Sequence, residues 1–170
     1  MSDIIKRVEK FKRGWTGGLP ETPCGFGSKI SQTGAQRDWL LKKVKELNIK
    51  TITDVGAGDL NWISRINFPK SVQYTPLDLY PRKPEVAKFD IIQEVPPKSD
   101  LILCLWVLNH LEKEDALKAY ANIEASGSKY LMMTYRPIWA DEQPVEFNKK
   151  GLEEIVINEN KKDVIKLIKL

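Results

Sequence analysis

Between residues 50 and 135 the sequence alternates short β-branched runs with helical or turn-forming stretches. This alternation predicts a sheet of parallel strands joined by crossovers, which is an α/β fold. Helical spacing predicts helices at about 60–66 and 112–125, the second closing at Gly127. Pro81 and Pro84 favour a loop between the second and third strands. The predicted strands cover residues 51–55, 72–77, 86–89, 101–105 and 130–135.

The N-terminal part, residues 1–48, combines two predicted helices with a glycine-rich loop. Apolar residues at helical spacing predict a helix over 3–13, and Gly14 is its expected end. Six of the ten glycines then fall within positions 14–34, together with Pro20 and Pro23, so we expect a long loop without regular structure. Such a loop either wraps the domain or approaches a ligand closely. The next helix, capped by Ser31 or Thr33, should bury the apolar positions Trp39, Leu40, Leu41, Val44 and Leu47 and end near Asn48.

The C-terminal residues 145–170 lose the alternation of strand and helix. Residues 154–158 and 163–170 predict a β-hairpin that adds an antiparallel pair to the sheet edge, with a short terminal helix as the alternative. The 170 residues therefore form one expected domain, in which residues 49–170 are the α/β core.

Composition excludes several classes of protein. Hydrophobic residues make up 42% and charged residues 29%, which are globular values. The chain has no apolar run long enough to span a bilayer and no signal-peptide pattern, so we expect a cytoplasmic protein without membrane attachment. Two cysteines and one histidine are too few for a disulfide framework or a zinc site, and we predict no metal. The net charge of +4 comes from scattered lysines, which does not indicate a nucleic-acid partner but leaves a polyanion site open.

A glycine turn follows the first predicted strand. Ligands of open α/β sheets bind at such a turn, outside the carboxyl ends of the strands. Gly56 and Gly58 fill the first two positions of the dinucleotide-binding pattern G-x-G-x-x-G, but Asn61 stands at the third. Asp59 lies where a pyrophosphate would sit, and its carboxylate repels phosphate. It favours a ligand with positive charge nearby, such as S-adenosylmethionine with its ammonium and sulfonium groups.

Two more carboxylates end predicted strands. Asp78 closes the second strand, 24 residues after Asp54, and an acid near that offset accepts hydrogen bonds from ribose hydroxyls. This feature serves NAD and S-adenosylmethionine equally. Asp90 ends the third strand, where its carboxylate could accept the amino hydrogens of adenine while Leu79 and Ile91 sandwich the ring. An ordinary polar strand cap is the alternative for Asp90.

Four segments in this order resemble class I S-adenosylmethionine-dependent methyltransferases: Asp-Val-Gly-Ala-Gly-Asp (54–59), Leu-Asp-Leu (77–79), Phe-Asp-Ile (89–91) and Asp-Leu-Ile-Leu-Cys-Leu-Trp-Val-Leu-Asn-His-Leu (100–111). The resemblance covers about residues 49–135. It implies a Rossmann-like three-layer α/β sandwich, a mostly parallel sheet with the antiparallel hairpin at its C-terminal end. In that family the glycine turn cradles the methionine part, the second-strand acid holds the ribose and the next acid reads the adenine, which implies those roles for Asp54, Gly56, Gly58, Asp78 and Asp90.

The stretches Trp15-Thr-Gly-Gly and Gly25-Phe-Gly-Ser28 resemble a small subgroup with a Gly-x-Gly-Ser loop before the first strand. We expect this loop to fold over the cofactor, with contacts from Trp15, Ser28 and Arg37. The short chain leaves little room for a substrate-recognition domain, so we expect a small-molecule acceptor. No Asn/Asp-Pro-Pro-Tyr stretch follows the fourth strand, which argues against amino methylation of DNA bases.

Catalytic groups are expected at the ends of the fourth and fifth strands. Methyl transfer from a sulfonium depends mainly on positioning, so a strong base is not required. His110 could serve as general base, or it could simply pack at a helix entry. Tyr135 follows the fifth strand, and Trp106 is either core or a wall of the cofactor site.

Three functions stay open from the sequence. The first is methyl transfer from S-adenosylmethionine to a small acceptor. The second is a degenerate Rossmann-like protein that binds this cofactor or another nucleotide without transfer. The third, an NAD-linked enzyme, is disfavoured by Asp59 and Asn61.

Overall fold

The computed structural model describes residues 9, 12, 20–135, 147, 151–158 and 163–170, and within them it forms one seven-stranded sheet. The strand order is β3-β2-β1-β4-β5-β7-β6. β1 to β5 run parallel, whereas β7 pairs antiparallel with both β5 and β6. The predicted α/β class and C-terminal hairpin are therefore confirmed. The bounds are β1 Thr51–Val55, β2 Gln73–Asp78, β3 Ala87–Lys88, β4 Leu101–Cys104, β5 Tyr130–Tyr135, β6 Glu153–Asn158 and β7 Asp163–Lys169.

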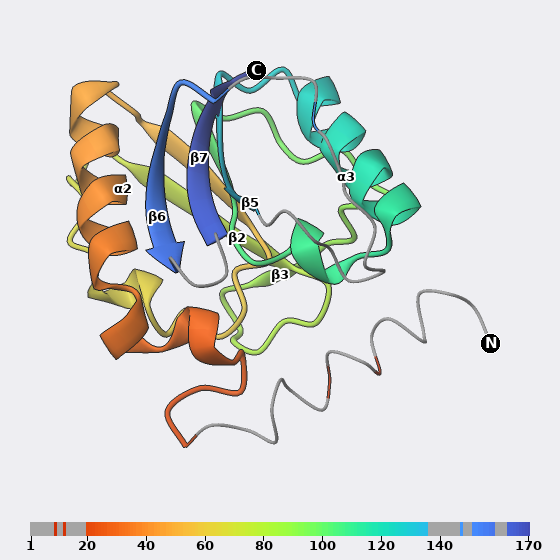
Figure 1. Cartoon of the computed structure of the whole chain (residues 1–170), viewed down its shortest axis with the longest axis horizontal. Coiled ribbons are helices and arrows are strands. Elements are labelled where there is room, and N and C mark those ends of the chain that lie inside the picture. Colours follow the sequence, from red (N-terminus) through yellow and green to blue (C-terminus); the bar gives the residue numbers. More distant parts are fainter. Residues whose placement is uncertain (1–8, 10–11, 13–19, 136–146, 148–150, 159–162) are drawn as a thin grey trace.

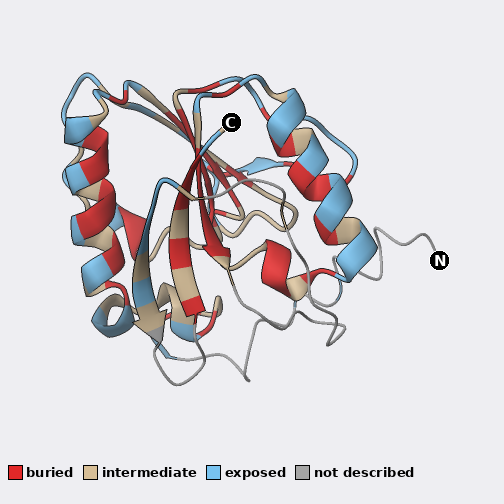
Figure 2. Cartoon of the chain, turned by 45° about the horizontal axis from the view of Figure 1, so that its top comes forward, coloured by how far each residue is buried: buried red, intermediate tan, exposed pale blue. Residues whose placement is uncertain are grey.

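Helices cover the two faces of the sheet and complete a three-layer sandwich (Figure 1). α2 (Gly34–Glu46) lies on one face and α3 (Lys113–Ala125) on the other. Each helix turns its buried residues toward the sheet (Figure 2). β4 serves both cores, because Leu101 and Leu103 pack in the cluster of α2 while Ile102 packs with Ile123 of α3.

An ion pair ties α2 to the edge of the sheet. Lys43 is 3% exposed, and its Nζ lies 2.6 Å from a carboxylate oxygen of Glu153 on β6 and 2.6 Å from one of Glu46. The hydrogen bond to Glu153, and after it the one to Glu46, raises the pKa of Lys43. This contact fixes the hairpin, which is distant in sequence, beside the helix that follows the N-terminal loop.

Several predicted elements differ from the structure. The predicted helix over 60–66 is wrong: only a 3₁₀ turn, η3 (Ile63–Arg65), forms there, because Leu60 takes the left-handed conformation with φ of 60°. The N-terminal loop contains two short turns, η1 (Phe26–Ser28) and η2 (Ile30–Gln32). Thr33 is the N-cap residue of α2 but makes no side-chain cap bond. The helix expected over 112–125 and the loop expected between β2 and β3 are confirmed.

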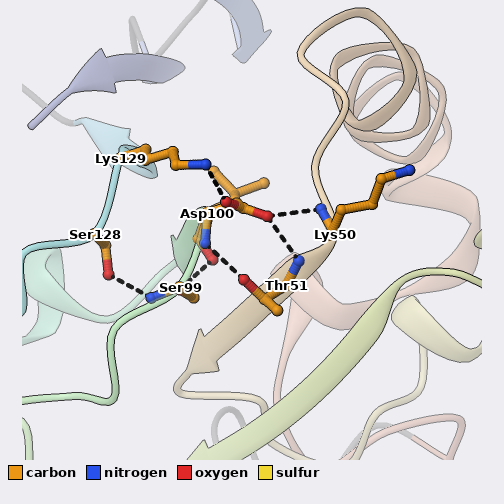
Figure 3. A network of polar contacts seen from close by, with 7 residues as sticks. Lys50, Thr51, Ser99, Asp100, Ser128 and Lys129 are labelled. Atoms are coloured by element: carbon orange, nitrogen blue, oxygen red, sulfur yellow. Dashed lines mark hydrogen bonds and ion pairs between the residues drawn. The ribbon is translucent and has the colours of Figure 1, made fainter.

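A polar network joins the starts of β1, β4 and β5, at the edge of the sheet where these parallel strands begin (Figure 3). One oxygen of Asp100 accepts hydrogen bonds from the backbone N–H groups of Lys50 (2.8 Å) and Thr51 (3.1 Å). The other lies 2.6 Å from Lys129 Nζ. The Lys129 contact holds the pKa of Asp100 below its usual range. The network therefore fastens the starts of three neighbouring strands to one another.

The helix expected over 3–13 falls largely outside the described residues, as does Trp15. In the part of the chain that is described, no helix has the length and apolar character needed to cross a bilayer. The same residues contain no group of three or more His, Cys, Asp or Glu side chains that could hold a metal.

Candidate functional site

A cavity of about 360 Å³ opens at the carboxyl ends of the parallel strands. Its wall combines segments that are far apart in sequence: the N-terminal loop, the glycine turn after β1, the ends of β2 and β4, and the hairpin. From β1 the chain first adds β2 and β3 on one side of the sheet and then crosses over to add β4 and β5 on the other side. The order of the strands therefore reverses between β1 and β4. Such reversals are the usual ligand sites of open α/β sheets.

The glycine turn is held in place by β2 and pressed between neighbouring side chains. The backbone N–H groups of Gly56 and Ala57 donate to the Leu77 carbonyl at 2.8 and 3.0 Å. Gly56 has φ of 85°, and a Cβ there would lie 2.2 Å from Val107 Cγ2. Gly58 has φ of 61°, and its Cβ would lie 2.9 Å from Cys24 Sγ. Both positions thus require glycine for the conformation as well as for the space.

Asp78 presents its carboxylate to the cavity. Oδ2 accepts the Gly58 N–H at 2.8 Å and Oδ1 accepts the Tyr80 N–H at 2.8 Å. A carboxylate has about four acceptor sites, so each oxygen keeps capacity toward the cavity. Burial raises the pKa of Asp78, and the two backbone bonds and Arg82 oppose that shift. The group is an oriented acceptor for hydroxyl donors.

Asp90 and apolar side chains form the wall beyond Asp78. Asp90 is 5% exposed, and its Oδ1 accepts the Ile92 N–H at 3.1 Å. Leu79 and Ile91 line the cavity beside it, and the apolar surface is extended by Phe89, Ile92 and Leu111. Ile91 is also fixed through its carbonyl, which accepts the side-chain amide of Asn122 at 2.7 Å. This arrangement places one carboxylate within an apolar surface.

The N-terminal loop closes the cavity from the other side. The Asn61 side-chain amide donates to the Ser28 carbonyl and to the Glu21 carboxylate, both at 2.8 Å. Gly27 lies against the Trp106 indole, where a Cβ would approach ring atoms to 2.7–2.9 Å. Ser28 and Trp106 line the cavity, while Arg37 instead bonds the Ile30 carbonyl at 2.9 Å and Thr33.

Besides Arg37, three predicted site residues among those described do not line this cavity. Asp54 is 4% exposed, accepts a hydrogen bond from the Tyr74 hydroxyl, and has its pKa raised by burial to about 7. Asp59 turns its carboxylate to the Asn61 N–H at 3.2 Å, and no α-helix begins there. Tyr135 packs with the α3 core, and Lys166 Nζ lies 4.1 Å from its ring centre. Only His110 of the two predicted catalytic residues lies on the wall.

Several wall residues were not singled out from the sequence. Gln36, Trp62, Ile157 and Asp163 all line the cavity. Gln36 and Asp163 stand at the start of the buried stripes of α2 and β7, and a polar residue at such a position is the signal that could have found them. Cys24 also lines it, but burial raises the pKa of its thiol to about 11, which keeps the sulfur neutral.

Comparisons with known proteins identify the fold. NodS, an N-methyltransferase from Bradyrhizobium japonicum WM9 solved with S-adenosyl-L-homocysteine, matches with a TM-score of 0.64 and 12% identity, covering 99% of this chain and 98% of that one. The magnesium protoporphyrin IX methyltransferase ChlM from Synechocystis PCC 6803, solved with bound S-adenosylmethionine, matches with a TM-score of 0.63 and 11% identity, covering 99% and 96%. The chain has the class I methyltransferase fold.

A third match is the methyltransferase domain of bacterial CtHen1, with a TM-score of 0.61 and 12% identity, covering 84% of this chain and all of that one. These similarities concern the fold, because the identities are very low. At the level of sequence, no family model matches the chain and no curated protein matches it. The assignment of the fold therefore rests on structural similarity alone. The function has to be argued from the residues that line the cavity.

Proposed function

We propose that this chain transfers a methyl group from S-adenosylmethionine to a small acceptor. The observation that carries the proposal is Asp78: its two oxygens are oriented by the Gly58 and Tyr80 N–H groups and face a cavity at the reversal point of the sheet. That carboxylate is suited to the two ribose hydroxyls of the cofactor, each of which needs an acceptor.

The other wall residues fit the remaining parts of the cofactor. Asp90 would accept the adenine amino hydrogens, with Leu79 and Ile91 against the ring. Gly56 and Gly58 line the cavity, and the methionine part would lie against this turn. A positively charged sulfonium would be favoured in a cavity that carries the carboxylates of Asp78 and Asp90. The same carboxylates disfavour a pyrophosphate, which argues against NAD.

Catalysis would depend on positioning. The bound cofactor supplies an activated methyl group, and the protein has to hold the acceptor in line with it while water is excluded. The N-terminal loop and Trp106 cover the cavity and would keep water away from the methyl group. His110 lies on the wall beyond β4 and would take a proton from an acceptor that needs deprotonation.

Calorimetry with S-adenosylmethionine and S-adenosylhomocysteine tests the proposal, with NAD and ATP as controls and the melting temperature followed in parallel. A ligand at 100 times its Kd should stabilise the fold by about 2.7 kcal/mol. Selective binding of the two methionine-derived ligands supports the proposal. Binding without methyl transfer to any acceptor would instead support the degenerate nucleotide-binding protein, and no binding would overturn both.

A further inference from the structure

The cavity has a second wall, distant from Asp78, that the cofactor residues do not use. It consists of Gln36 from α2, Trp106 after β4, and Ile157 and Asp163 from the hairpin, which we call the hairpin wall. Asp163 is 1% exposed and Gln36 is 4% exposed, yet both border the cavity. Among the described residues, Gln36 Nε2 is buried without a hydrogen-bond partner, and because buried polar groups are nearly always hydrogen-bonded, this wall needs an explanation.

The sheet geometry places these residues on one face. Along β7, Asp163, Ile165 and Leu167 alternate with more exposed residues, and Ile165 and Leu167 belong to the core beneath α2. Ile157 of β6 packs against the same core. Gln36 lies one turn before Trp39 and Leu40, which are the α2 residues in that core. α2 runs beside β6 (Figure 1), so the four residues converge at the carboxyl end of the parallel strands.

The hairpin wall lies beyond the reach of the ribose site. Strand order puts β1, β4 and β5 between β2, which ends at Asp78, and β7, which starts at Asp163. Four strand spacings of about 4.8 Å separate the two strands by roughly 19 Å. In the cofactor the methyl group is carried by the sulfur bonded directly to the ribose C5′, so it stays near Asp78. The hairpin wall is therefore on the acceptor side of the methyl group.

The chemistry of this wall selects a nitrogen compound. A carboxylate offers only acceptors, so Asp163 favours an ammonium or N–H group. Among the described residues, Gln36 Nε2 is buried with no hydrogen-bond partner, and it can donate to an oxygen or ring nitrogen. The Trp106 indole adds a surface for an apolar or cationic part. We infer, resting on the proposed function, that the acceptor is a small amine whose nitrogen faces Asp163 and whose neighbouring acceptor atom meets Gln36.

The transfer step balances with these groups. The lone pair of the uncharged amine nitrogen attacks the methyl carbon, a nitrogen–carbon bond forms, and the carbon–sulfur bond breaks with its electron pair going to sulfur. The positive charge moves from sulfur to the methylated nitrogen, and Asp163 faces that charge. The proton on the product nitrogen passes to water as the product leaves. No further co-reactant is needed.

Binding to the S-adenosylhomocysteine complex tests the inference without turnover. The probes are phenylglycinamide, which carries an ammonium and a carbonyl, and mandelamide, which has a hydroxyl in place of the ammonium. We expect calorimetry to show phenylglycinamide binding about tenfold or more tightly than mandelamide, as for one charge-assisted hydrogen bond. Asp163→Asn should abolish this preference and leave the affinity for S-adenosylhomocysteine within about twofold. Glu154→Gln, which removes an exposed carboxylate from the same hairpin, should change neither.

The outcomes are distinct. Equal binding of the two probes, no binding of either, or a preference that survives in Asp163→Asn would overturn the inference. A large loss of S-adenosylhomocysteine affinity in Asp163→Asn would do the same, because it would assign Asp163 to the cofactor. If that variant does not fold, Gln36→Leu replaces it, with a severalfold loss of phenylglycinamide binding expected and no loss overturning the inference. Failure of the wild type to bind S-adenosylhomocysteine would instead sink the proposed function itself.

Discussion

The side-chain amide of Asn61 donates a 2.8 Å hydrogen bond to the main-chain carbonyl of Ser28. Asn61 stands where the dinucleotide-binding pattern has its third glycine, and Ser28 ends the turn that covers the cavity. The same amide reaches Glu21, whose carboxylate also accepts the Ile30 N–H at 2.7 Å. The departure from the pattern therefore has a structural role, since it fastens the N-terminal loop to the glycine turn.

Replacing Asn61 by Gly should loosen this loop while restoring the third glycine. Two hydrogen bonds are lost, which predicts a destabilisation of about 1–3 kcal/mol at this contact. Hydrogen exchange should speed up in residues 20–32, and S-adenosylhomocysteine should dissociate faster. Ser64→Ala, which removes a bond to the Asn61 carbonyl but none to the loop, is the control. Unchanged protection of residues 20–32 in Asn61→Gly would show that the loop is held by other contacts.

Asp78→Ala should weaken the binding of S-adenosylmethionine by at least about tenfold, because two hydroxyl groups lose a charged acceptor. Calorimetry measures the effect. Asp115→Ala is the control, since Asp115 lies on α3 and pairs there with Lys118. Folding has to be checked by the melting curve, because the Gly58 and Tyr80 N–H groups also lose their partner. An unchanged affinity in a folded Asp78→Ala protein would remove the ribose assignment.

Gly56 and Gly127 form a natural pair for testing the glycine turn. Both have positive φ, 85° and 66°, but a Cβ at Gly56 would meet Val107 at 2.2 Å, whereas nothing lies within 4 Å at Gly127. Gly127→Ala should cost about 1–2 kcal/mol of unfolding free energy from backbone strain alone. Gly56→Ala should cost about 1–3 kcal/mol more, because a well-packed contact is overfilled. Urea denaturation of the two variants decides, and equal losses would mean that the turn relaxes away from Val107.

Local patterns of the sequence predicted most of the fold. The five parallel strands and the hairpin follow from runs of β-branched and apolar residues, with bounds that differ from the structure by at most one residue at an end. The helix expected over 60–66 failed because apolar spacing does not report a left-handed residue such as Leu60. The strand order depends on contacts between distant segments, and no local pattern contains it.

The sequence indicated the wall of the cavity near Asp78 and Asp90 better than the hairpin wall. Asp78 and Asp90 stand at strand ends, where an acid is conspicuous after an apolar run, and the structure brings both to the cavity. Asp163 begins the last strand of a hairpin, and it reaches the cavity only because β7 inserts between β5 and β6. Tyr135 also ends a strand, but the alternation of β5 turns it to the α3 core. Which face a strand-end residue takes is therefore decided by the sheet.

Asp54 and its partner Tyr74 should make stability depend on pH near neutrality. Burial raises the pKa of Asp54 from 3.8 to about 7, the Tyr74 hydrogen bond opposes this, and Asp78 adds to it. A carboxyl group whose pKa is raised on folding binds its proton more tightly in the folded state. Its contribution to stability is therefore complete below about pH 4 and is lost as the pH rises to about 7. A shift of about 3 pKa units corresponds to up to roughly 4 kcal/mol.

The measurement is the unfolding free energy from urea curves between pH 4 and 8 for the wild type and Asp54→Asn. The difference between the two proteins should fall as the pH rises and level off above about pH 7, because the amide does not titrate. Taking the difference cancels Asp100, whose pKa is lowered and whose contribution is lost as the pH falls. In Tyr74→Phe the fall of this difference should extend to higher pH, because the substitution removes the hydrogen bond that favours the Asp54 carboxylate. A difference that stays flat across this range would mean that Asp54 is ionised throughout, with its charge stabilised by the Tyr74 hydroxyl.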